Sequence, residues 1–241
     1  EDQVAALKTA QVAALTTANL AAMSEDQVAA LTTAQVTALT TAQIVALTED
    51  QVAAMGTAQL AALTTAQLAK METDDIAAIT TDQITALKTA QMAALTTAQI
   101  VALTTDQVST LSTLQLAVLT SAQLLKMETD DIAAITTAQI TALTTAQIAA
   151  LTTAQAVAIS EDQVAVLKTA QLAALTTANF VEMSTDQLAA ITTAQISALT
   201  TAQVSALTED QAVSLSEDQV AALKTAQVAA LTTANLAAMS E

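Results

Sequence analysis

Residues 39–50 read LTTAQIVALTED, and most of the chain repeats this phrase with small changes. Cut into octets from residue 1, the 241 residues give thirty units with no insertion or deletion, followed by Glu241. A large apolar residue occupies position 4 in 28 units, and Leu, Ile or Met occupies position 7 in all thirty. Position 3 is Gln in 25 units, Asn in three and Asp in two. Such a fixed period is typical of a repeat architecture.

The eight-residue period decides the secondary structure. In a continuous helix eight residues turn the chain by two turns plus about 80°, and mild supercoiling absorbs only about 20° per heptad. An unbroken helix would therefore wind its apolar stripe around its own axis. In a strand, positions 4 and 7 would point to opposite faces, and Ala-rich units favour helix over strand. The sequence predicts one short helix per octet, with a break between consecutive helices.

The junctions between octets carry helix-capping residues. Position 8 is Ser or Thr in 23 units, and the residue three positions later is then Gln, Asn or Asp, which has the form of a capping box. The first such caps are predicted at Thr16, Ser24, Thr32, Thr40 and Thr48. Where position 8 is another residue, the next residue is always Thr, and we expect its hydroxyl to cap instead. Each octet is thus interpreted as a capped helix of about two turns.

Positions 4 and 7 lie on one edge of the helix, separated by about 60°, and are predicted to form the core. Val36, Leu39, Ile44 and Leu47 are examples. Positions 2, 5 and 6 then face outward. Because helices shorter than about 12 residues are marginal in water, each unit must be held by its neighbours.

A second period of 56 residues, or seven octets, overlies the first. The run Glu72-Thr73-Asp74-Asp75 recurs at residues 128–131, and Ala156-Val157 recurs at residues 212–213. Two turns of 28 residues would give a filled core. The sequence therefore predicts an all-α solenoid, or superhelix, with about 3.5 octets per turn, as one continuous domain over residues 1–241. At about 8–10 Å between stacked helices, it would form a rod on the order of 80 Å long.

A third period appears at the two ends of the sequence. Residues 1–25 are identical to residues 217–241, a shift of 216 residues. We expect the sequence to be a window on a longer tandem array with a 216-residue repeat.

Composition removes most chemical functions. The chain contains no His, Cys, Trp, Tyr or Pro, so the usual zinc, haem and iron–sulfur ligands are missing, as are thiol nucleophiles and imidazole bases. A net charge of −17 has the wrong sign for binding nucleic acid. No apolar run of about 18 residues occurs, so we expect no membrane insertion. We expect no enzymatic activity and no cofactor.

Two features leave alternative functions open. The first is a pair of carboxylate groups that could hold Ca²⁺, which prefers six to eight oxygen ligands, although acidic residues at helix N-termini also stabilise helices. The second is the regular threonine pairs, which resemble those of Thr-arrayed antifreeze proteins. The carboxylate candidates are Glu72, Asp74, Asp75, Glu128, Asp130 and Asp131.

Two resemblances bear on function. The phrases LTTANLAA at residues 15–22 and LTTAQVTAL at residues 31–39 resemble the first helix of transcription-activator-like effector repeats, but the basic and base-reading residues of that family are absent. All thirty units resemble the LTTAQ-type octapeptide arrays of very large bacterial surface or secreted proteins, some of them adhesin-like. This resemblance implies a structural segment located outside a bacterial cell.

The sequence therefore predicts a structural protein. We expect a stalk, or a self-assembling extracellular filament whose partners are copies of itself, joined end to end or laterally. A Thr-arrayed ice-binding protein and a calcium-loaded adhesin spacer are the alternatives.

Overall fold

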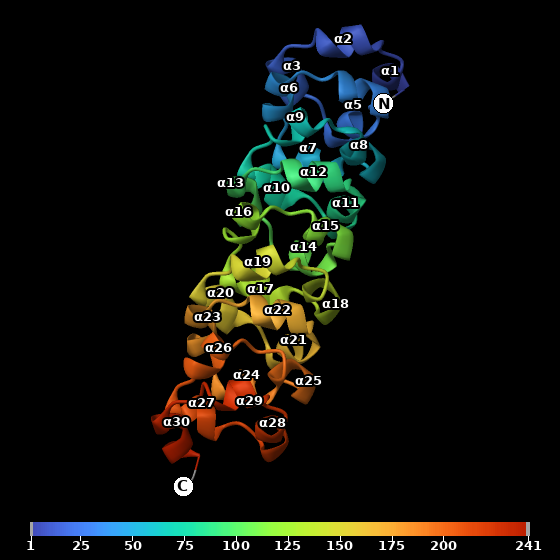
Figure 1. Cartoon of the computed structure of the whole chain (residues 1–241). Coiled ribbons are helices and arrows are strands. Elements are labelled where there is room, and N and C mark those ends of the chain that lie inside the picture. The colour runs from blue at the N-terminus through green and yellow to red at the C-terminus, as the bar shows by residue number, and fades with distance from the viewer. Residues whose placement is uncertain (1, 240–241) are drawn as a thin grey trace. The chain divides into compact units, whose positions relative to one another are not determined.

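The computed structural model describes residues 2–239, and within them it contains thirty α-helices and no strand (Figure 1). One helix occupies each octet, as the eight-residue period predicts. The fold class is therefore confirmed as all-α, with short helices in tandem. The contacts divide the chain into two compact units, Glu1–Lys126 and Met127–Glu241, which we describe separately. The interpretation of residues 1–241 as a single continuous domain stays a prediction.

Unit 1 contains the first sixteen helices of the described residues. They are α1 (Asp2–Ala5), α2 (Thr9–Ala13), α3 (Thr17–Ala21), α4 (Glu25–Ala29), α5 (Thr33–Ala38), α6 (Thr41–Val45), α7 (Glu49–Ala54), α8 (Thr57–Ala62), α9 (Thr65–Leu68), α10 (Thr73–Ala78), α11 (Thr81–Ala86), α12 (Thr89–Ala94), α13 (Thr97–Val101), α14 (Thr105–Thr110), α15 (Thr113–Ala117) and α16 (Ser121–Leu124).

Unit 2 contains the other fourteen helices of the described residues. They are α17 (Thr129–Ala134), α18 (Thr137–Ile140), α19 (Thr145–Ala149), α20 (Thr153–Ala158), α21 (Glu161–Val166), α22 (Thr169–Ala174), α23 (Thr177–Glu182), α24 (Thr185–Ala189), α25 (Thr193–Ile196), α26 (Thr201–Ser205), α27 (Glu209–Val213), α28 (Glu217–Ala221), α29 (Thr225–Val228) and α30 (Thr233–Ala238).

The helices are shorter than the two turns predicted from the sequence. Typical ones have five or six residues, as α4 and α5 do, which is about one and a half turns. The helix stops early because the backbone becomes extended near position 7. Leu39, for example, has φ −60° and ψ 138°, and the next residue, Thr40, has φ −72° and ψ 157°. Two or three residues of each octet therefore form the link to the next helix.

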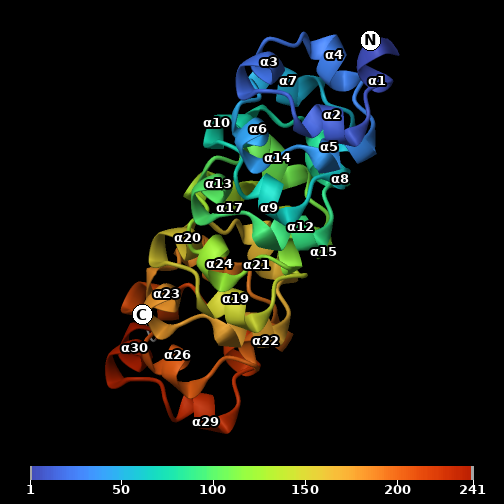
Figure 2. The ribbon, with the colours of Figure 1, turned by 90° about the horizontal axis from the view of Figure 1, so that it is seen from above.

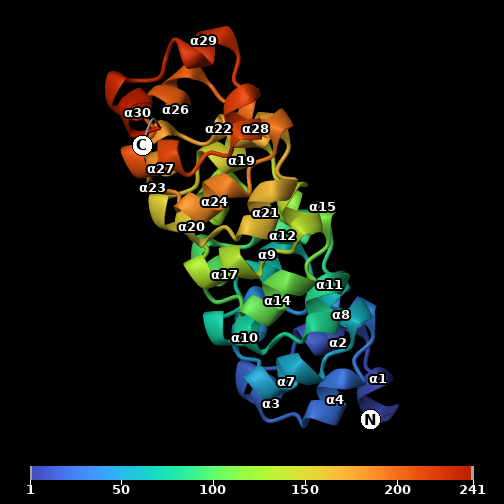
Figure 3. The same cartoon turned by 90° about the horizontal axis from the view of Figure 1, so that it is seen from below.

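In each unit a helix packs against the helix three places further along the chain. In unit 1, α2 contacts α5, and α5 contacts α8, as Figure 2 shows. In unit 2, α20 contacts α23, and α27 contacts α30 (Figure 3). The same neighbour relation recurs along each unit, which is the pattern expected of a repeat protein whose units are held by adjacent units.

The core of each unit is built from positions 4 and 7. Val36 and Ile44 at position 4 are 0 % exposed, and Leu39 and Leu47 at position 7 are 4 % and 6 % exposed. Burying an aliphatic side chain of this size contributes roughly 1.5–3 kcal/mol. These contacts hold together helices that would not be stable alone.

Candidate functional site

Position 3 is where the fold buries its polar side chains. Within residues 2–239, every buried polar or charged side chain lies at position 3, beginning with Gln35 and ending with Asn235. Gln35 is 2 % exposed and Gln171 is 1 % exposed. We call these side chains, from residue 35 onward at intervals of eight residues, the glutamine ladder. The sequence identified position 3 only as a capping position and did not predict its burial.

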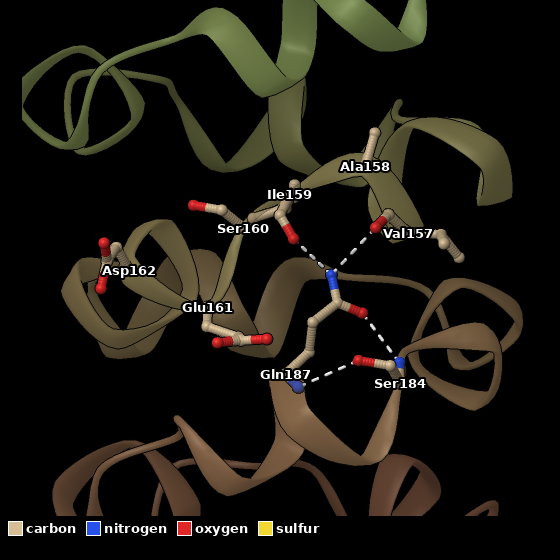
Figure 4. Close-up of a pocket in the computed structure, with 8 residues that line it drawn as sticks. All are labelled: Val157, Ala158, Ile159, Ser160, Glu161, Asp162, Ser184 and Gln187. Atoms are coloured by element: carbon tan, nitrogen blue, oxygen red, sulfur yellow. Dashed lines mark hydrogen bonds between the residues drawn. The ribbon is translucent and has the colours of Figure 1, made fainter.

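Gln187 shows the geometry of one rung of the ladder (Figure 4). Its side-chain oxygen Oε1 accepts the backbone N–H of Ser184 at 2.8 Å, and its own backbone N–H donates to Ser184 Oγ at 3.1 Å. These two bonds close the N-terminus of α24. The amide nitrogen Nε2 points the other way and donates to the carbonyl oxygens of Val157 and Ile159, at 3.2 and 2.5 Å.

The same register recurs in both units. In unit 1, Gln43 Nε2 donates to the carbonyl of Val12, 31 residues earlier, at 2.9 Å, and to that of Leu15, 28 residues earlier, at 2.8 Å. In unit 2, Gln171 Nε2 makes the equivalent bonds to Ile140 and Leu143, at 2.9 and 2.8 Å. Each rung therefore joins the start of one helix to the end of another helix four octets earlier.

An amide suits this position because it carries a donor and an acceptor and no charge. The acceptor satisfies an N–H group that the helix start leaves without an intrahelical partner, and the donor satisfies a carbonyl that the end of another helix leaves over. An unsatisfied buried group of this kind costs roughly 1–3 kcal/mol. The ladder thus removes two such costs at every rung.

The hydroxyl groups at position 8 complete the helix starts. At Thr16, Ser24, Thr32, Thr40 and Thr48 the side-chain oxygen accepts the backbone N–H of the residue three positions later, at 3.1 to 3.3 Å. At the junctions without a hydroxyl at position 8, the N-cap side chain makes no such bond. These N-caps are Lys8, Gly56, Glu72, Lys88, Glu128, Lys168 and Lys224.

The expectation that the following threonine takes over the cap was wrong. Thr9, for example, is already the first helical residue of α2, so its hydroxyl is not placed at the N-cap, where a side chain reaches the third N–H of the helix. Instead, the backbone N–H of Gln11 donates to the carbonyl of Lys8 at 2.9 Å. The glutamine still contributes, because its Oε1 accepts the N–H of Lys8 at 2.7 Å.

Two rungs carry aspartate in place of an amide. Asp75 is 3 % exposed and Asp131 is 2 % exposed. Each accepts an N–H bond at 3.1 Å, from Glu72 and Glu128 respectively. Burial raises the pKa of both carboxyl groups to about 6. The N–H bonds act in the opposite direction, and nearby carboxylates such as Glu72 and Asp74 raise the pKa of Asp75 further.

The carboxylates that were candidates for calcium lie at helix starts. Glu72 and Glu128 are the N-caps of α10 and α17, and Asp74 and Asp130 lie in the first turns of these helices. Within residues 2–239 the structure contains no group of three or more acidic, His or Cys side chains arranged to hold a metal ion. The ionisable residues of these clusters are thus placed where the helix dipole favours negative charge.

A surface hollow of about 370 Å³ lies beside the Gln187 rung (Figure 4). Ser160 and Ser184 are among its lining residues. Both hydroxyl groups are engaged as caps, because they accept the backbone N–H groups of Gln163 and Gln187 at 3.2 and 3.1 Å. A serine nucleophile requires an adjacent general base, and the sequence contains no His. The arrangement of these residues is therefore that of helix capping.

The ALTTAQ repeat family model matches this sequence eight times, over residues 1–33, 26–57, 52–89, 68–105, 85–113, 124–161, 164–201 and 180–217. These matches cover most of the chain. The chain belongs to the ALTTAQ repeat family. Each ALTTAQ phrase spans a junction: its leucine provides the carbonyl at position 7, its first threonine is the N-cap, and its glutamine is the rung. No curated protein sequence matches the chain.

None of the helices in residues 2–239 has the length and apolar character that spanning a lipid bilayer requires. The longest of them, such as α5, have six residues, whereas a bilayer span needs about 20.

Proposed function

We propose that this ALTTAQ array is a structural protein that spans distance, as a stalk or as a filament segment. In this proposal the octets wind into a superhelix with about 3.5 octets per turn. One observation carries it: the amide of the ladder reaches back by 28 and 31 residues wherever we follow it, from Gln43 in unit 1 to Gln219 in unit 2. A spacing of 28 residues corresponds to 3.5 octets.

Repetition of this kind supports a spacer. Each helix is stabilised by the helices three and four octets away, so stability is a sum of unit and neighbour contributions, and adding octets requires no redesign. The solvent-facing positions are filled mainly by Ala and Thr. Inside the array, the Ser and Thr hydroxyls at position 8 serve as caps. Such a chain supplies length and surface rather than a reaction.

The proposed location is the outside of a bacterial cell, on or released from the surface. The resemblance of all thirty octets to arrays in very large bacterial surface or secreted proteins supports this location. The net charge of −17 suits an extended, soluble segment and disfavours nucleic acid as a partner. The proposed partners are further copies of the same chain.

Small-angle X-ray scattering tests the spacer. The chain is compared with a lengthened version in which residues 33–88, seven octets, are duplicated in tandem. We expect the maximum dimension to grow by roughly 16–20 Å, two helix-packing distances, with an unchanged cross-section. Growth of the radius of gyration as in a compact globule, roughly with the 0.38 power of length, would contradict the proposal.

The same preparation separates the two alternative functions. A calcium-loaded spacer requires that adding Ca²⁺ raises the melting temperature and that a chelator reverses the rise. A Thr-arrayed ice-binding protein requires inhibition of ice recrystallisation. We expect neither effect, because the carboxylates lie at helix starts and the position 8 threonines cap helices.

A further inference from the structure

The first octets of the array carry ladder amides with nothing to bind. Gln3, Gln11, Asn19 and Gln27 occupy position 3, but their side-chain amide nitrogens donate to no backbone carbonyl within residues 2–239. The first amide that does so is Gln35, which donates to the carbonyl of Leu7 at 2.7 Å. Accordingly, Gln11 and Asn19 are exposed, whereas Gln35 is buried. We call these four side chains the donor edge.

The last octets carry the complementary carbonyls. In the ladder, the carbonyl at position 7 accepts the amide 28 residues further on, as that of Leu199 accepts Gln227 Nε2 at 2.8 Å. Four later carbonyls at position 7 receive no such amide within residues 2–239. They belong to Leu215, Leu223, Leu231 and Met239, and we call them the acceptor edge.

The apolar core is also open beside the acceptor edge. Val220, Val228 and Leu236 at position 4 are 37 %, 45 % and 50 % exposed, whereas Val36 and Ile44 at the same position are 0 % exposed. A hollow of about 440 Å³ lies among α27, α28 and α30 and is lined by Leu215 and Val220. Figure 3 shows these helices beside one another near the C-terminus. Amides and apolar side chains are both lacking here, as if four octets had been removed.

The two edges match in register. If the first octet of a second copy follows octet 30, the 28-residue spacing brings Gln3 to Leu215 and Gln11 to Leu223. By the same spacing, Asn19 meets Leu231 and Gln27 meets Met239. The octet frames also agree, because residues 1–25 are identical to residues 217–241. The same pair of edges arises wherever an array of this repeat starts and stops.

We infer that the donor edge of one chain docks on the acceptor edge of a second copy, so that the ladder continues from chain to chain. This inference rests on the proposed structural function and specifies end-to-end rather than lateral association. The recognition chemistry is a row of four amide donors meeting a row of four backbone carbonyls beside an apolar core. Because each copy carries a charge of −17, association must strengthen as salt shortens the Debye length from about 10 Å at 0.1 M.

The test compares two triple variants of the full chain with the wild type. The donor-edge variant is Gln3→Glu, Gln11→Glu and Gln27→Glu, which keeps the side-chain oxygen that accepts the N–H of Lys8 or Ser24 and removes the amide donor. The control is Ala42→Glu, Ala66→Glu and Ala98→Glu, which adds the same charge at exposed sites on α6, α9 and α13. Circular dichroism confirms that each variant folds.

Sedimentation equilibrium in about 0.5 M NaCl, where screening is strong, measures association over a range of concentrations. We expect the wild type and the control to form linear oligomers, and the donor-edge variant to associate roughly tenfold more weakly or less. A wild type that is monomeric at every concentration would overturn the inference, as would equal association of both variants. If the monomer still lengthens with added octets, the spacer function stands; if it does not, that function fails independently.

Discussion

The amide at position 3 performs two tasks that no charged or apolar side chain of its length can combine. A glutamate would accept the N–H at the helix start equally well, since Glu and Gln both complete a capping box. Yet position 3 holds Gln, Asn or Asp in all thirty octets and Glu in none. This absence is the sequence signal for a required N–H donor, and it could have revealed the ladder before the structure did.

Replacing Gln99 by glutamate should expose the value of one rung. Gln99 Nε2 donates to the carbonyls of Leu68 and Met71, at 2.8 and 2.9 Å, and the substitution removes both bonds and buries a carboxylate. We expect the free energy of unfolding at neutral pH to fall by about 2–3 kcal/mol. Urea denaturation measures this fall.

The matched control is Gln27→Glu, where the amide donates to no backbone carbonyl within residues 2–239. Its effect should stay within about 0.5 kcal/mol, as for an ordinary surface substitution. Equal losses at residues 27 and 99 would mean that the donor contributes nothing.

The aspartate rungs make stability depend on pH. The pKa of Asp75 rises from 3.8 to about 6 on burial, so between these values the native state binds more protons than the unfolded state. Its stabilising contribution is therefore complete below about pH 4 and is lost as the pH rises through 6. The same holds for Asp131. The wild type should unfold more readily at pH 7 than at pH 4.

Asp75→Asn should remove part of this dependence. Asn179 shows that the shorter amide reaches a carbonyl, because its Nδ2 donates to Leu151, 28 residues earlier, at 2.8 Å. At pH 7 we expect the variant to be more stable than the wild type by on the order of 2 kcal/mol, and below pH 4 the difference should vanish. Chemical denaturation at pH 4 and 7 checks this. A gain that is equal at both pH values would contradict the titration argument.

Helix positions follow from the sequence, whereas helix lengths do not. The hydroxyl at Thr96 and the glutamine three residues later predict where α13 begins, because both interactions are local. The end of each helix is decided by a distant contact. The carbonyl of Met71 accepts the amide of Gln99, 28 residues further on, so the backbone turns outward before a second full turn forms. A rule based on local propensity cannot anticipate that.

Capping can be tested at the junction of Thr96 and Thr97. Thr96 Oγ1 accepts the backbone N–H of Gln99 at 3.2 Å, whereas Thr97 is the first helical residue of α13. Thr96→Ala should cost about 1 kcal/mol, and Thr97→Ala should be nearly neutral. Thermal unfolding followed by circular dichroism compares them. If both substitutions cost the same, the cap would not reside at position 8.

The interaction register was foreseen in part. The 56-residue recurrence of Glu72-Thr73-Asp74-Asp75 suggested a spacing of 28 residues, and the ladder bonds have that spacing. The burial of position 3 was missed, because a polar residue is normally exposed unless it is paired, and the partner of Gln43 lies 31 residues earlier at Val12. A single octet read alone contains no trace of that partner.

A chain with an eight-residue frame and a 28-residue register should tolerate deletions of whole octets only. Deleting residues 185–192 removes α24 and brings Gln195 to the carbonyl of Ile159, which Gln187 occupies in the intact chain. Deleting residues 185–188 instead brings Gln195 opposite Gln163, inside α21. Three rungs are then lost, those of Gln195, Gln203 and Gln211.

We expect the octet deletion to retain one cooperative transition with a melting temperature within a few degrees of the wild type, because unit and neighbour contributions are preserved. The half-octet deletion should lose about 1–3 kcal/mol per rung, although it removes fewer residues. Thermal unfolding monitored by circular dichroism distinguishes the two. Equal losses would show that the register does not control stability. A smaller loss for the shorter deletion would show that stability depends on length alone.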